Sequence, residues 1–200
     1  MRRRSAGCRR GVELRTLGAT ASLLGCLVSC GGGTPDARNP DRPLPPYVGH
    51  ATELFDDGID PTAVGFPGDP SGSPLGDNRV RERTQIGDAV VRARVRTVTS
   101  KVEDRGNSWQ IGFHVVERLG GAGPLEADFT VPVLASDPAA GIVHAFEARL
   151  IGKTFIVFVR EFSHAGSPQG DPGDLRFHVS GDTPDENKAV RAAVALEAVH

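Results

Sequence analysis

The feature that most constrains the fold is a series of five short segments between residues 88 and 180 that have the side-chain pattern of β-strands. The first places apolar and basic residues on opposite faces, Ala89, Val91, Ala93 and Val95 against Arg92, Arg94 and Arg96. A period of two is typical of a strand with one buried face. Gly and Pro together make up one fifth of the chain. We therefore expect a turn-rich β domain with little helix.

The other four segments follow in order and are separated by turns. A polar turn from Glu103 to Asn107 predicts a hairpin between the first two, and Pro132 predicts that the third is an edge strand. The fourth, Thr154 to Phe162, is apolar on both faces, so we expect it to be the most buried strand. Alternating apolar residues mark the other three: Trp109, Ile111, Phe113 and Val115; Phe129, Val131 and Val133; Leu175, Phe177 and Val179.

A helix is predicted at residues 184–199. Thr183 provides an N-cap, Pro184 suits the first helical position, and Glu186 is placed to complete a capping box. An apolar stripe at helical spacing then predicts packing on the sheet: Ala189, Val190, Ala193, Val194 and Leu196. The strands and this helix predict a mainly β fold, a small five-stranded OB-like barrel with a C-terminal α-helix, at residues 84–200.

The N-terminus has the three parts of an export signal, which we assign to residues 1–29. Six arginines precede an uncharged run from Leu17 to Val28, which is shorter than the roughly 20 residues of a spanning helix. The sequence Leu27-Val28-Ser29-Cys30 resembles the lipobox of bacterial lipoproteins. This resemblance implies cleavage between Ser29 and Cys30, a diacylglyceryl group on the Cys30 thiol, and attachment to a membrane through lipid. The alternative is an ordinary secretory signal with an incidental cysteine.

Cleavage before Cys30 would change both the cysteine count and the charge. Cys8 and Cys26 leave with the leader, so no disulfide is expected in the mature chain. Loss of six arginines and one glutamate leaves 17 basic and 24 acidic residues and a formal net charge of about −7. Nucleic acid is therefore not expected as a partner. Gly31 stands where some Gram-negative lipoproteins carry an inner-membrane retention aspartate, which favours the outer membrane.

Between the leader and the β domain we expect two further segments. Residues 30–46 are rich in Gly and Pro and predict a flexible tether. Residues 47–83 predict an irregular arm that packs on the domain. Four aspartates of this arm, Asp56, Asp57, Asp60 and Asp69, could bind calcium, but their spacing does not match an EF-hand and favours turns.

The β domain also resembles a known family. From Gly87 to Ser180 its pattern is similar to netrin-like, or tissue-inhibitor-of-metalloproteinase-like, OB-fold domains, through residues 88–95, 113–120 and 152–159. The resemblance implies the fold alone, because the paired cysteines of that family are absent here. The inhibitors of that family reach a protease zinc through a free N-terminal cysteine, whereas Cys30 would be lipidated. Protease inhibition is therefore not expected.

The sequence contains no recognisable motif for a catalytic, cofactor-binding or metal site, so none is predicted. Four histidines, His114, His144, His164 and His178, could meet to hold zinc, but they lack short ligand spacing. The arginine stripe of the first strand could bind a polyanion, although acidic neighbours are the more ordinary partners. The prediction is a membrane-anchored cell-envelope lipoprotein whose β domain is a non-enzymatic module for a protein or glycan partner. The alternatives are an envelope hydrolase that uses acidic residues of the arm and a structural envelope-assembly accessory.

Overall fold

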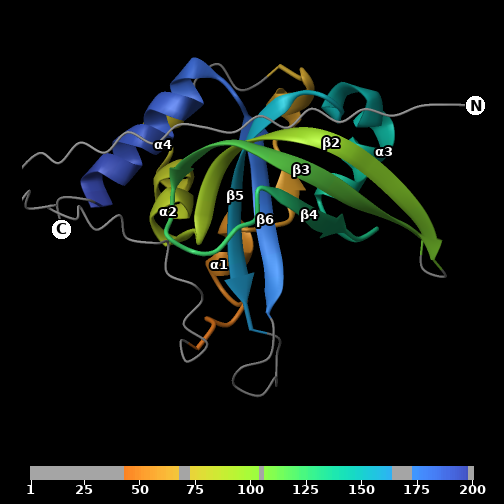
Figure 1. Ribbon diagram of the computed structural model, residues 1–200, viewed down its shortest axis with the longest axis horizontal. Helices are drawn as coiled ribbons and strands as arrows, with labels where there is room; N and C mark the ends of the chain where they lie inside the picture. Colours follow the sequence, from red (N-terminus) through yellow and green to blue (C-terminus); the bar gives the residue numbers. More distant parts are fainter. Residues whose placement is uncertain (1–42, 68–72, 104–105, 164–172, 198–200) are drawn as a thin grey trace, which may run out of the picture. The chain divides into compact units, whose positions relative to one another are not determined.

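The computed structural model describes residues 43–67, 73–103, 106–163 and 173–197 (Figure 1). The helices are α1 (Ala51–Leu54), α2 (Asn78–Ile86), α3 (Ala139–Leu150) and α4 (Pro184–Glu197), with 3₁₀ turns η1 (Pro61–Val64) and η2 (Pro74–Gly76). The strands are β1 (Gly58–Ile59), β2 (Ala89–Glu103), β3 (Gly106–Gly120), β4 (Asp128–Val133), β5 (Thr154–Phe162) and β6 (Asp174–Gly181). The fold is mainly β, because 41% of the described residues are in strands and 33% are helical, so the helical content is higher than the sequence predicts.

The strands form one open sheet in the order β1-β6-β5-β2-β3-β4. β1 and β6 are parallel, and the other neighbours are antiparallel. The five predicted strands are present, β4 is an edge strand as Pro132 indicates, and β5 is buried on both faces. The predicted five-stranded OB-like barrel is wrong, because the sheet has six strands and does not close.

Helices on both faces explain why the sheet stays open. One face packs against α3, which contributes Ala139, Val143 and Leu150 to its core. The other face packs against α1, α2 and α4 through Leu54, Val80 and Val190. An open sheet exposes two faces and needs a cover for each, whereas a small barrel seals one face inside itself. The apolar residues on both faces of β5 are the sequence signal for this arrangement.

The arm is more regular than predicted. It contains α1, the parallel edge strand β1 and two 3₁₀ turns, and its last residues form most of helix α2. The end of the predicted tether is also paired, because the Ser163 amide donates to the Pro45 carbonyl at 2.9 Å and Pro46 forms a β-bridge with Ser163. The part of the chain that contacts the sheet therefore begins before Tyr47.

Candidate functional site

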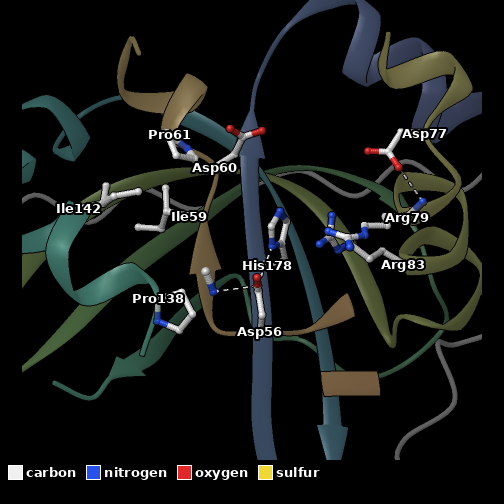
Figure 2. A pocket seen from close by; sticks show the side chains of 11 residues that line it. Asp56, Ile59, Asp60, Pro61, Asp77, Arg79, Arg83, Pro138, Ile142 and His178 are labelled. Carbon is white, nitrogen blue, oxygen red and sulfur yellow. Dashed lines mark hydrogen bonds and ion pairs between the residues drawn. The ribbon is translucent and has the colours of Figure 1, made fainter. Parts of the chain in front are cut away.

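A cleft of about 380 Å³ lies beside β1 at the edge of the sheet (Figure 2). The arm, the first turns of α2 and α3, and β6 all contribute to its walls. Its charged or titratable residues are Asp56, Asp60, Asp77, Arg79, Arg83 and His178. Its apolar side chains are Ile59, Pro61, Pro138 and Ile142. The cleft therefore combines hydrogen-bond donors and acceptors with an apolar surface.

The centre of the cleft is a hydrogen-bonded pair, Asp56 and His178. Pairing of Gly58 with His178 in the β1–β6 ladder brings the two side chains together from positions 122 residues apart. The Asp56 carboxylate lies 2.8 Å from Nδ1 of His178 and accepts the Gly58 amide at 3.1 Å. A proton on Nδ1 leaves Nε2 of the neutral ring as an acceptor. Nε2 has no hydrogen-bond partner among the described residues.

The electrostatics of this pair favour an ionised aspartate beside a neutral histidine. Burial lowers the pKa of His178, and the nearby charge of Arg83 opposes its protonation further. Burial alone would raise the pKa of Asp56, but the hydrogen bond and charge of His178 and the charge of Arg83 outweigh it, so this pKa is lowered. Figure 2 shows Arg79 and Arg83 extending from α2 toward the pair.

Helix α2 supplies the basic side of the cleft. Asp77 caps the helix by accepting the Arg79 backbone amide at 2.8 Å. The side chain of Arg79 takes no part in this cap, and its exposed guanidinium lies at the cleft. Arg83 is buried, and its Nε donates to the Leu54 carbonyl at 2.6 Å. Arg83 therefore ties α2 to α1, whereas Arg79 is available to a ligand.

Glu186 is a buried carboxyl group whose pKa is affected by the charges of three cleft residues, Asp60, Asp77 and Arg83. Thr183 caps α4 as predicted, because its hydroxyl accepts the Glu186 amide at 3.1 Å. The reciprocal half of the predicted capping box is absent, since the Thr183 amide donates to Gly181 instead. Burial raises the pKa of Glu186 to about 7 against a hydrogen bond from Ser180, and the charges of Asp60 and Asp77 add to the rise. One oxygen of Glu186 is buried and has no hydrogen-bond partner among the described residues.

The described aspartates considered as a calcium site in the arm do not all lie together. Asp56 and Asp60 line the cleft, and Asp60 also caps η1 by accepting the Thr62 amide at 2.9 Å. Asp57 instead bonds Arg176 at 2.5 Å and the Phe177 amide at 3.1 Å, which fastens the arm to β6. Asp69 lies outside the described residues.

The described histidines that were considered as zinc ligands do not form one site. His114 pairs with Asp128 at 2.8 Å, His144 lies near the ring of Trp109, and His178 pairs with Asp56. His164 is outside the described residues. Within the described part of the chain, no three His, Cys, Asp or Glu side chains are grouped to hold a metal ion.

The three arginines of the β2 stripe differ in their partners. Arg92 bonds Asp182 at 2.8 Å and Glu117 at 3.1 Å, the acidic neighbours that the sequence favours. Arg94 and Arg96 are exposed and have no ion-pair partner in the described segments. Ser29 and Cys30 lie outside the described residues, and in the rest no helix is long and apolar enough to span a membrane.

Sequence reasoning missed Arg79, Arg83 and the α3 residues of the cleft. Asp77 before a run of good helix formers, followed by Gly87, was a usable signal for α2. Apolar residues at helical spacing, Ala139, Val143 and Leu150, were a comparable signal for α3. The Asp56–His178 pair had no local signal, because it depends on the register of β1 and β6.

A scan against protein-family models and a search of curated proteins both gave no match to this chain. The function proposed below therefore depends on the leader sequence and on the geometry of the cleft.

Proposed function

We propose that this protein is a cell-envelope lipoprotein, attached through lipid on Cys30 to the outer membrane, whose β domain is a non-enzymatic module that binds a glycan. The lipobox and the Gly-rich segment after it support the anchor. The cleft supports the binding role and favours it over that of a purely structural accessory. The observation that carries the proposal is the convergence of paired Asp56 and His178 with exposed Arg79 in one cleft.

The side chains of the cleft suit a hydroxyl-rich ligand. Sugar hydroxyls both donate and accept hydrogen bonds, and the cleft offers carboxylate acceptors at Asp60 and Asp77 and a guanidinium donor at Arg79. Pro138 and Ile142 add an apolar surface of the kind that packs on the face of a sugar ring. A few placed polar groups on an apolar surface are typical of a ligand site.

Calorimetric titration of the full chain in detergent with soluble oligosaccharides released from bacterial envelopes tests this role. Arg79→Gln should weaken binding about tenfold, the effect of losing one charge-assisted hydrogen bond. Arg81→Gln is the matched control, since Arg81 is exposed on the same helix and does not line the cleft. No heat with the wild-type chain, or equal weakening by both substitutions, would contradict the proposal.

An envelope hydrolase is the second candidate, and the Asp56–His178 pair favours it. A neutral histidine oriented by a carboxylate at Nδ1 can accept a proton from water at Nε2. Asp60, on the same cleft, would serve as the second carboxyl group. Turnover of those oligosaccharides that is lost in His178→Gln and kept in Arg81→Gln would replace the binding role with this one.

A further inference from the structure

Half of strand β2 has a neighbour on one side only. Residues Ala89–Arg94 pair with β5, and the amide and carbonyl of Val95 bond Lys153 and Gly152. From Arg96 onward, β3 is the only strand that pairs with β2 in the described part of the sheet. Figure 1 shows the paired ends of β2 and β3 projecting beyond β5 and β6. We call residues 96–102 the free edge of β2.

The free edge is open to solvent. Its side chains are exposed apart from half-buried Val98, and Val102 at its end is 84% exposed. Successive residues of a strand point their amide and carbonyl groups to alternate sides. Every second residue of the free edge therefore presents a backbone donor and acceptor that pair with no strand in the described part of the sheet, which makes this edge a template for one more strand.

The charge at this edge favours one kind of occupant. Arg94 and Arg96 are exposed without an ion-pair partner in the described segments, and exposed Lys153 lies where β5 stops covering β2. This basic patch belongs to a chain whose expected mature form is acidic. A second copy paired antiparallel would place Arg96 of one copy near Lys101 of the other, which like charges oppose. An acidic strand would meet complementary charges instead.

We propose that the free edge of β2 binds an extended acidic peptide segment of a partner protein as an added strand. Backbone hydrogen bonds would supply affinity, and Arg94 and Arg96 would select acidic side chains. This surface is separate from the cleft beside β1, because β1 and β2 are divided by β6 and β5 in the sheet.

Fluorescence anisotropy with three labelled peptides of about ten residues, the length of a long strand, tests the proposal on the full chain in detergent. One peptide alternates Val or Thr with Glu, one carries Lys in place of Glu, and one is the Glu peptide N-methylated at every residue. We expect binding of the Glu peptide alone, with slower amide hydrogen exchange at residues 96–102. Binding of the N-methylated peptide would show charge attraction without strand pairing and would overturn the proposal.

Charge reversal gives the second part of the test. The double substitution Arg94→Glu and Arg96→Glu should weaken the Glu peptide at least about tenfold and allow the Lys peptide to bind. Arg81→Glu, on α2, is the matched control and should leave the Glu peptide unaffected. Amide hydrogen exchange at residues 96–102 that slows as the protein concentration rises, without peptide, would assign the edge to a second copy of the chain. An exchange rate that no peptide changes would show that no peptide pairs with the edge. Either result contradicts the proposal.

Discussion

Glu186 is a buried acidic residue whose shifted pKa makes the stability of the protein depend on pH. Its pKa is raised to about 7 by burial, from an ordinary value of 4.5. A carboxyl group with a higher pKa in the folded chain binds its proton more tightly when folded, so its stabilising contribution is lost as pH rises from 4.5 to about 7. Above that range the folded chain carries a buried charge with one unpartnered oxygen.

Glu186→Gln should therefore stabilise the protein at alkaline pH. The gain in free energy of unfolding over wild type should be small at about pH 5 and reach roughly 2 kcal/mol at about pH 8. Urea unfolding of both proteins at each pH measures the difference. Glu147→Gln, at an exposed glutamate of α3, is the matched control. The same gain at both pH values would show that Glu186 is not the titrating group.

The pKa values of two histidines should be shifted in opposite directions from the ordinary value. Burial lowers the pKa of His178, whereas hydrogen bonds to Glu82 and Glu53 raise the pKa of exposed His50. In an NMR titration, His178 should keep its neutral signals at a pH where His50 is already protonated. His178 protonating first would contradict the geometry of the cleft.

Residues with local partners were predictable from sequence, and residues with distant partners were not. The cap at Thr183 needs only the next three residues. The sequence favours acidic partners for Arg92, but it does not indicate which residues they are, because Asp182 lies 90 residues away. The spacing of Glu186 from Thr183 predicts a role in a capping box, while the burial of Glu186 depends on how α4 packs on the sheet.

At the scale of elements, the strands were predictable because each has its own period of two. Helices α2 and α3 were not predicted, because residues 78–83 belong to the segment expected to be an irregular arm and residues 139–150 lie between the third and fourth predicted strands. The barrel prediction followed from that omission, since five strands with a single covering helix must seal their other apolar face against themselves. The two-faced apolar pattern of β5 shows that both faces of the sheet are covered.

The loop after β3 depends on close backbone contact with the start of β2. Arg118 holds this contact by donating to the carbonyl groups of Asp88, Gly121 and Gly123. Gly121 has a φ of +74°, and a Cβ there would lie 2.4 Å from the Asp88 carbonyl oxygen. Only glycine can occupy this position without moving the β2 backbone.

Gly121→Ala should therefore destabilise the protein more than a matched substitution at Gly152. Gly152 has a similar φ of +81°, but a Cβ there would meet nothing within 4 Å. Gly152→Ala should cost about 1 kcal/mol for backbone strain, and Gly121→Ala about 2 kcal/mol or more beyond that. Thermal unfolding of both variants measures the difference, and equal costs would contradict the close contact.

For the whole molecule, the proposed role combines an anchor, a tether and a domain with two separate surfaces. The cleft beside β1 and the free edge of β2 are divided by β6 and β5. The sequence suggested the anchor through a local motif and the β class through periodicity. It could not suggest either surface, because each arises from the order of strands in the sheet.

Lipid attachment at Cys30 is the claim on which this role most depends. Cells expressing the full chain can be supplied with labelled palmitate, and the protein isolated from their membranes. Label should appear in the wild-type chain and in Cys26→Ala, whose cysteine lies in the leader, and should be absent from Cys30→Ala. No label in the wild-type chain, or equal label in Cys30→Ala, would contradict the anchor and with it the proposed place of the protein in the envelope.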